Sequence, residues 1–196
     1  MPEHCTTLLL LRHGPAAVPP GCLVGRTDLP LSGHGMERLS SLLPELNTVA
    51  RWYCSPLRRA QQTLAYLHQQ GCALAPPLYD QRLREIDFGS WELRSFAEIA
   101  ATEPSQVEAW QHYEDFAFPG GEAVAGFVSR VAELLADFSA QGGRIAAVTH
   151  GGVIRTMICL ALGLPPRSYL LFDVQPASLT ILDLFPGGGV LRGLNL

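Results

Sequence analysis

Short apolar runs recur along the chain and are separated by amphipathic stretches. The runs at 6–11 and 145–149 are continuous, which is typical of strands buried on both faces of a sheet. Another strand is predicted at 49–54, and residues 178–184 and 190–194 are predicted as closing strands around the turn "PGGG".

The segments between these strands predict helices. They cover residues 33–43, capped by Ser32, then 56–70, 122–141 and 152–162. In 122–141 the apolar residues recur at helical spacing. A further short strand is expected at 73–78. Strands that alternate with helices predict an α/β fold, a three-layer α/β/α sandwich with a mainly parallel central sheet.

Two stretches interrupt this alternation. Residues 12–31 are rich in glycine and proline and predict a long loop, and loops of this length are often functional. Residues 80–121 are irregular, with a helix expected near 96–101 and an aromatic stretch after it. We therefore expect one domain, 1–196, with a small cap inserted at about 80–121.

Composition narrows the class of protein. With 196 residues and 47% hydrophobic content, the chain can bury one core, and it has no apolar run of membrane-spanning length. The net charge is −4 and the 14 basic residues are all arginine, so we expect neither nucleic-acid nor membrane binding, and an anion site must be a local pocket of arginines.

The cysteines argue against a metal centre. Five widely spaced cysteines without a C-x-x-C pair indicate neither a zinc ribbon nor a redox motif. Free thiols suit a reducing compartment, and the N-terminal segment has no basic region followed by a signal-peptide core. We expect a cytoplasmic protein.

Two predicted strands end in the same way. "LLLLRHG" and "AAVTHGG" both run from apolar residues into a histidine and a glycine, at His13 and His150. In open parallel sheets, ligands bind beyond the carboxyl ends of the strands. A single histidine at a strand end is more often structural, but two such units predict a shared crevice in which backbone amides approach an anion.

A third strand end carries arginines. Arg58 and Arg59 are placed at the start of a predicted helix, where the helix dipole disfavours cations. An anion bound there offsets this cost, and only one of the pair need point inward. Two solvated surface arginines are the simpler alternative.

The stretch "LREIDFGSWE" supplies candidate acids. Glu85, Asp87 and Glu92 lie beside Phe88 and Trp91 in the sequence. Apolar surroundings favour the neutral form of a carboxyl group, which suits a general acid. An acidic surface turn is equally compatible with this spacing.

Taken together, the ordered motifs resemble those of the histidine phosphatase superfamily, also called the phosphoglycerate mutase-like family. The motifs are "LLRHG" at 10–14, "GRTDLPLSGHG" at 25–35, "SPLRRAQQT" at 55–63, "LREIDFGSWE" at 83–92, "FPGGE" at 118–122 and "VTHGGVIR" at 148–155. The resemblance implies a phosphoglycerate mutase-like fold and phosphoryl transfer through a covalent phosphohistidine, without cofactor or metal.

The resemblance also implies the roles of five residues. His13 matches the nucleophile, Arg12 and Arg59 match the phosphate-binding arginines, and His150 matches the second histidine of the phosphate pocket, expected to be protonated. Glu85 matches the proton donor to the leaving group. These types suit a loose phosphoryl transition state, in which positioning and electrostatics dominate.

Further contacts follow less directly. Gly25, Glu122 and Gly151 are candidate substrate-binding residues, and Glu122 could also cap the helix after it. The chain departs from the family after "RHG", where Pro15 and Ala16 replace the usual polar residues. We expect a polar contact to be missing there.

Three motifs, "GRTDLPLS", "DFGSWE" and "FPGGE", resemble the α-ribazole phosphatase branch, which favours α-ribazole 5′-phosphate, from cobalamin biosynthesis, as the substrate. A broad-specificity phosphatase, a phosphoglycerate mutase-like enzyme and a non-catalytic phospho-ligand module are the alternatives. The expected partner is a small-molecule phosphomonoester, and the sequence is compatible with a homodimer.

Overall fold

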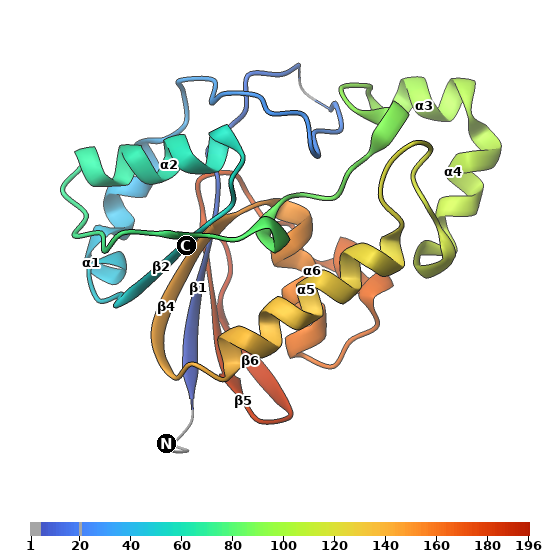
Figure 1. The fold of residues 1–196 in the computed structure, drawn as a ribbon. Helices are drawn as coiled ribbons and strands as arrows, with labels where there is room; N and C mark the ends of the chain where they lie inside the picture. Colours follow the sequence, from blue (N-terminus) through green and yellow to red (C-terminus); the bar gives the residue numbers. More distant parts are fainter. Residues whose placement is uncertain (1–4, 20) are drawn as a thin grey trace.

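A six-stranded sheet runs through the middle of the computed structural model, which describes residues 5–19 and 21–196 (Figure 1). Its strand order is β3-β2-β4-β1-β5-β6. The strands are β1 (Thr6–Arg12), β2 (Arg51–Cys54), β3 (Leu78–Tyr79), β4 (Gly143–Thr149), β5 (Leu179–Phe185) and β6 (Gly188–Gly193).

The half of the sheet that leads to the functional site is parallel. β1 pairs with β4 and β4 with β2, all parallel, so that Arg12 lies opposite Thr149 where both strands end. On the other side, β5 and β6 are antiparallel, as their tight connection requires. The sheet is therefore mixed, with the predicted parallel arrangement in β3, β2, β4 and β1.

Helices cover both faces of this sheet (Figure 1). They are α1 (Leu43–Leu46), α2 (Arg58–Gln69), α3 (Phe96–Thr102), α4 (Pro104–Trp110), α5 (Val124–Ser139) and α6 (Gly151–Ala161). Side chains alternate along β1, so Leu8 and Leu10 pack toward α5 and α6 while Leu9 and Leu11 pack toward α2. The predicted three-layer α/β/α sandwich is confirmed.

Two predicted elements are wrong in extent. In place of a helix at 33–43 capped by Ser32, a 3₁₀ segment (Glu37–Leu42) leads into the short α1, because Gly33 and Gly35 adopt positive φ angles of 80° and 75°. The strand predicted at 73–78 shortens to β3, because prolines 76 and 77 have no N–H groups for pairing.

Residues 80–121 hold α3, α4 and three 3₁₀ turns. The expected helix near 96–101 is α3, which begins with a capping box between Ser95 and Glu98, whereas α4 was not anticipated. Trp91, Trp110 and Phe118 pack together beneath these helices, with ring centroids 5.5–5.7 Å apart. All three rings belong to residues 80–121, and the hydrophobic cluster that includes Trp91 and Phe118 also includes Val124 and Phe127 of α5. No helix in the described residues is long and apolar enough to cross a bilayer.

Candidate active site

The two histidines singled out from the sequence meet where β1 and β4 end. His13 follows β1 directly, and His150 precedes the first residue of α6. The backbone N–H of His13 donates to the Thr149 carbonyl at 2.9 Å, which extends the pairing of the two strands. The ring centroids of His13 and His150 are consequently only 4.9 Å apart. Both side chains are buried.

Hydrogen bonds determine which nitrogen of His13 carries the proton. Nδ1 lies 2.6 Å from the carbonyl oxygen of Gly14, which can only accept, so Nδ1 is protonated. Nε2 accepts from Nε of Arg59 at 3.2 Å. The lone pair of His13 therefore sits on Nε2 and faces the Arg59 guanidinium, the direction from which a bound phosphoryl group can be attacked.

Two arginines complete this pocket. Arg59 is fully buried and donates to the carbonyls of Thr27 and Gly25 at 2.9 and 2.6 Å. Arg12 donates through Nη1 to the carbonyl of Val174. Burial lowers the pKa of both guanidiniums from its ordinary value, but arginine stays a cation at neutral pH. We call Arg12, His13, Arg59 and His150 the basic pocket.

The basic pocket leaves hydrogen-bonding groups unused. In the described part of the chain, Nε of Arg12 and Nδ1 of His150 are buried without a protein partner. Buried polar groups are almost always paired, so two such atoms in one pocket indicate a ligand. A tetrahedral oxyanion can accept from Arg12 and from the protonated form of His150 together.

Both histidines are neutral in the free site. Burial first, and then the charges of Arg59 and Arg12, lower the pKa of His13 well below its ordinary value of 6.5. Burial and the neighbouring His13 and Arg59 lower the pKa of His150 in the same way. The protonated His150 expected from the sequence therefore requires a bound anion, which would stabilise the charged form.

This neutrality predicts that acid destabilises the protein. Below pH 6.5 the unfolded chain binds protons on His13 and His150 that the folded chain does not, so stability falls as the pH falls. Each histidine that stays neutral contributes up to about 1.4 kcal/mol per pH unit below its unfolded pKa. Urea unfolding at pH 7 and pH 5 should show a smaller loss of stability in His13→Gln than in the wild type. The exposed control His68→Gln should keep the wild-type loss, and an unchanged loss in His13→Gln contradicts the prediction.

Glu85 reaches the site from the other side. Its side chain is 8% exposed and accepts from the N–H of Gly152 at 2.8 Å, in the first turn of α6. A Cβ on Gly152 would stand 2.3 Å from the carboxylate, so this approach requires glycine. Burial lowers the pKa of Arg12 and of Arg59, and the negative charge of Glu85 partly opposes this lowering.

A cavity of about 290 Å³, here called the mouth cavity, opens beside Glu85 and Arg12. Its polar lining includes Gly151, whose Cβ would lie only 3.3 Å from the Arg12 guanidinium, so glycine keeps this contact open. The apolar lining is formed by Leu23, Val24, Ile86, Phe88, Trp110, Tyr113, Phe118, Phe127, Tyr169 and Leu170.

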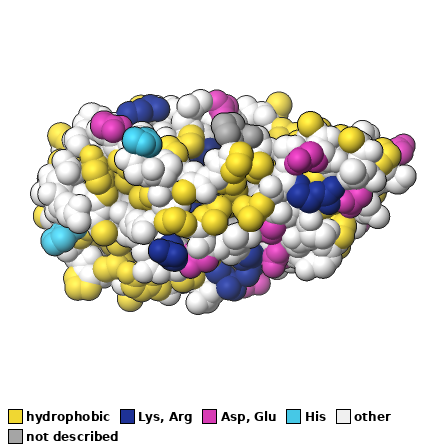
Figure 2. Space-filling model, turned by 90° about the horizontal axis from the view of Figure 1, so that it is seen from above, with side chains coloured by type: hydrophobic (Ala, Val, Ile, Leu, Met, Phe, Trp, Pro, Cys, Tyr) yellow, Lys and Arg dark blue, Asp and Glu magenta, His cyan; other side chains and the backbone are white. Residues whose placement is uncertain are grey.

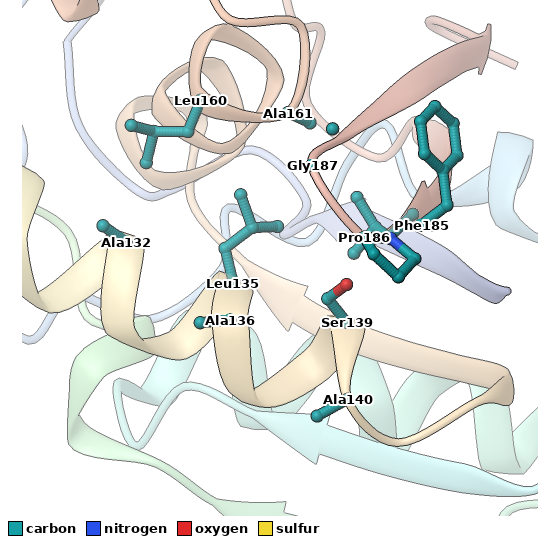
Figure 3. Close-up of a pocket in the computed structure, with 12 residues that line it drawn as sticks. Ala132, Leu135, Ala136, Ser139, Ala140, Leu160, Ala161, Phe185, Pro186 and Gly187 are labelled. Atoms are coloured by element: carbon teal, nitrogen blue, oxygen red, sulfur yellow. The ribbon is translucent and has the colours of Figure 1, made fainter. Parts of the chain in front are cut away.

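A larger cavity, of about 550 Å³, lies between α5, α6 and the turn after β5 (Figure 3). Its lining consists of small and apolar residues with one serine, Ser139, and no titratable group. Leu184 lies opposite Thr6, so this cavity is at the start of β1, the far edge of the sheet from His13. The titratable residues Arg12 and Glu85 line the mouth cavity instead.

Of the three candidate substrate-binding residues, only Gly151 lines the mouth cavity. Gly25 uses its carbonyl to bind Arg59 and its N–H to bind Glu92. Glu122 does not cap α5, whose N-cap is Ala123, and its carboxylate pairs with two arginines. The cap prediction is wrong because the chain turns this carboxylate away from the helix N-terminus.

Several supporting residues were not anticipated from the sequence. Ser55 Oγ lies 2.8 Å from Nε2 of His150, and Thr63 Oγ1 accepts from the N–H of Gly14 at 3.0 Å. Glu92, considered as an acid, instead accepts backbone N–H bonds from Gly25 and Arg26 at 3.1 and 2.7 Å. Only the position of Thr63 one helical turn after Arg59 could have indicated its role.

The two residues after "RHG" make backbone contacts to the segment around Leu31. Ala16 forms an isolated antiparallel bridge with Leu31, and the Pro15 carbonyl accepts from the N–H of Ser32 at 2.8 Å. Neither Pro15 nor Ala16 belongs to the mouth cavity lining. These two residues therefore tie the loop to the segment that precedes the first 3₁₀ turn.

Residues 5–19 and 21–196 contain no cluster of three or more histidine, cysteine or acidic side chains suited to a metal.

By its fold, the protein is an α/β enzyme of the phosphoglycerate mutase-like class. The sequence model of the histidine phosphatase superfamily (branch 1) matches residues 8–196. The chain belongs to this superfamily and is a phosphatase.

Individual relatives are phosphatases of different names. The chain is 29% identical over 194 residues to the adenosylcobalamin/alpha-ribazole phosphatase of Escherichia coli, covering 96% of this chain and 95% of the relative. The crystal structure of the alpha-ribazole phosphatase from Shigella flexneri superimposes with a TM-score of 0.81 at 30% identity, over 97% and 96% of the two chains. A mycobacterial glucosyl-3-phosphoglycerate phosphatase gives 0.81 at 25% identity, over 97% and 99%.

Proposed function

We propose that this phosphatase hydrolyses a small phosphomonoester through a phosphohistidine on His13. The observation that carries the proposal is the protonation pattern of His13, with Nδ1–H bonded to the Gly14 carbonyl and the Nε2 lone pair facing Arg59. A phosphate group bound to Arg59 takes the place of this Nε2 contact. The nucleophile then points at phosphorus without any change of tautomer.

In the first step, Nε2 of His13 forms a bond to phosphorus while the bond from phosphorus to the leaving oxygen breaks. Arg12, Arg59 and His150 bind the three equatorial oxygens, whose charge persists through a loose transition state. Glu85, protonated, donates its proton to the leaving oxygen, so that an alcohol departs rather than an alkoxide.

The second step regenerates the enzyme. The Glu85 carboxylate accepts a proton from water, the water oxygen forms a bond to phosphorus, and the phosphorus–nitrogen bond of His13 breaks. Inorganic phosphate leaves and Glu85 is again protonated. The four residues of the basic pocket and Glu85 supply every charge that these steps need, so we propose that hydrolysis is independent of added metal.

The mouth cavity favours an alcohol with a flat apolar part. Phe88, Trp110, Tyr113 and Tyr169 face the space beyond Glu85. A second cavity of about 440 Å³ shares Trp110, Tyr113 and Tyr169 with it and extends toward Phe96. Seen from above, apolar side chains run across the middle of the molecule (Figure 2). These aromatic walls suit the benzimidazole of α-ribazole 5′-phosphate, and the name of the Escherichia coli relative supports the same substrate.

Matched substrates test this proposal. α-Ribazole 5′-phosphate and ribose 5-phosphate present the same primary phosphate and differ in the base. Burial of about 100 Å² of base contributes about 2.5 kcal/mol, so kcat/KM should be at least tenfold higher for α-ribazole 5′-phosphate, with and without EDTA. Phosphate release from these two compounds and from 3-phosphoglycerate is the measurement. Equal kcat/KM for all three contradicts the substrate, and no turnover of any phosphomonoester contradicts the mechanism.

A further inference from the structure

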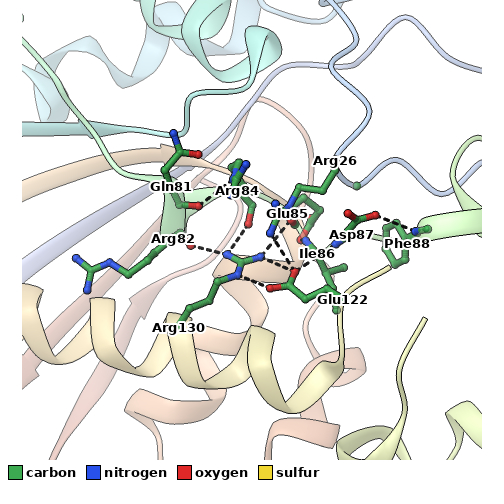
Figure 4. Close-up of polar contacts among 12 residues, drawn as sticks. Arg26, Gln81, Arg82, Arg84, Glu85, Ile86, Asp87, Phe88, Glu122 and Arg130 are labelled. Carbon is green, nitrogen blue, oxygen red and sulfur yellow. Dashed lines mark hydrogen bonds and ion pairs between the residues drawn. The ribbon is translucent and has the colours of Figure 1, made fainter. Parts of the chain in front are cut away.

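Three charged side chains meet at the segment that carries Glu85, with Arg26 above it and Glu122 and Arg130 below it in the view of Figure 4. Glu122 binds Arg130 through two contacts, 2.7 Å to Nε and 3.0 Å to Nη2. The same carboxylate accepts from Nη2 of Arg26 at 3.3 Å. We call Arg26, Glu122 and Arg130 the charged clamp. Its members come from the loop after β1, the residue before the N-cap of α5, and α5 itself.

The two arginines of the charged clamp converge on one residue's backbone. Nε of Arg26 donates to the Glu85 carbonyl at 2.9 Å, and Nη2 of Arg130 donates to the same oxygen at 3.1 Å. Nη1 of Arg130 also donates to the carbonyls of Arg82 and Arg84, at 2.6 and 2.8 Å. Residues 85–88 belong to no helix or strand, so side chains supply the bonds that regular structure would otherwise provide.

Glu122 holds the chain on the far side of Glu85 as well. Its carboxylate accepts from the N–H of Asp87 at 3.3 Å. The side chain of Glu85 is in turn bound by the N–H of Gly152. Glu85 is thereby fixed at both its backbone and its carboxylate, by two separate sets of contacts.

We propose that Glu122, Arg130 and Arg26 are positioning residues that hold Glu85 at proton-transfer distance from the leaving oxygen. This rests on the proposed role of Glu85 as the general acid. Proton transfer requires heavy atoms within about 2.6–3.2 Å, and displacements of about 1 Å at a catalytic group cost orders of magnitude in rate.

The burial of the clamp supports a positioning role over simple stabilisation. The side chains of Arg26, Glu122 and Arg130 are only 24%, 17% and 15% exposed. The free-energy cost of removing these charges from water offsets much of the attraction between them. Apolar side chains in the same place would stabilise the fold at least as well as the ion pairs do. Although burial raises the pKa of Glu122, its bonds with Arg130 lower it below the ordinary value overall, so the carboxylate is ionised at neutral pH. The charged groups fix the position of the backbone, because they bind three of its carbonyls and one N–H group, that of Asp87, at the same time.

The test compares two substrates that differ in their need for an acid. The leaving group of 4-nitrophenyl phosphate departs as a stable anion, whereas that of benzyl phosphate must be protonated. For Glu122→Gln, kcat/KM should fall at least tenfold with benzyl phosphate and less than about threefold with 4-nitrophenyl phosphate. Equal losses for the two substrates, or no loss for either, overturn the proposal.

Two further variants guard the interpretation. Arg26→Met leaves the pair of Glu122 and Arg130 intact, so it keeps the test open if Glu122→Gln folds poorly, and it should show a smaller selective loss of about threefold or more. Asp137→Asn is the matched control on α5. It removes an ion pair with Arg82 at a 58% exposed side chain and should leave both substrates within twofold of the wild type.

The comparison with Glu85→Gln separates the two levels of the proposal. If Glu85→Gln loses benzyl phosphate selectively while Glu122→Gln does not, the charged clamp is not a positioning device and the acid stands. If Glu85→Gln loses both substrates equally, Glu85 is not the acid, and both proposals fall. Selective loss in both variants supports the charged clamp.

Discussion

His13→Ala should lose at least 10⁴-fold in the turnover of 4-nitrophenyl phosphate. The substitution removes the Nε2 lone pair, and no other nucleophile of the pocket has its geometry, since Nε2 of His150 lies 2.8 Å from Ser55 Oγ. Arg12 and Arg59 remain, so substrate should still bind. A steady-state assay of nitrophenol release, with vanadate or phosphate binding measured alongside, separates lost chemistry from lost binding.

The control for this variant is His68→Ala, on the exposed face of α2. It should retain wild-type turnover. His13 makes its side-chain bonds to Gly14 and Arg59, and neither belongs to the hydrophobic core, so His13→Ala should keep the wild-type circular dichroism spectrum. Turnover within tenfold of the wild type in purified His13→Ala refutes the nucleophile.

Arg59→Met should lower kcat/KM by about 10³-fold. Nε of Arg59 donates to Nε2 of His13 at 3.2 Å, and Met fills a similar volume without charge or donors. Loss of one preorganised donor to a developing oxyanion typically costs 10²–10³-fold, and here a full charge is lost as well. The variant also leaves the carbonyls of Gly25 and Thr27 without their donor, so a modest loss of thermal stability is expected.

The neighbouring arginine provides the matched control. Arg58 is exposed, and its backbone N–H donates to Asp28 Oδ1 at 2.7 Å, a bond that a side-chain substitution keeps. Arg58→Met removes the same charge from the same turn of α2 and should stay within threefold of the wild type. Comparable losses in Arg58→Met and Arg59→Met would show that the effect is one of general charge and not of the pocket.

The strand ends could be located from the sequence because a continuous apolar run and the polar residues after it mark the end of a buried strand without reference to distant contacts. The leucines of β1 can only be a buried strand, and a histidine and a glycine after two such strands must share an edge if the strands are parallel neighbours. The same rules left open whether one of Arg58 and Arg59 points inward or both lie on the surface. The helix start could be read from the sequence, but which of the two is buried came from the resemblance.

The parts that could not be predicted depend on contacts between distant segments. Glu92, Glu85 and Asp87 have similar apolar neighbours in the sequence, yet only Glu85 reaches the N-terminus of α6. Glu92 is drawn instead to backbone N–H groups of the loop after β1, more than sixty residues away. The local sequence does not distinguish the positions of these three carboxylates, because each position depends on how segment 80–121 packs against the sheet.

The most direct test of the account is the capture of the phosphorylated intermediate. The enzyme is mixed with substrate, quenched in base within its first turnovers and kept at alkaline pH, where a phosphohistidine survives, before peptide mass spectrometry. We expect one phosphoryl group on His13 in the wild type and none in His13→Ala. A phosphoryl group on His150, or hydrolysis with no phosphorylated peptide at any time, contradicts the account.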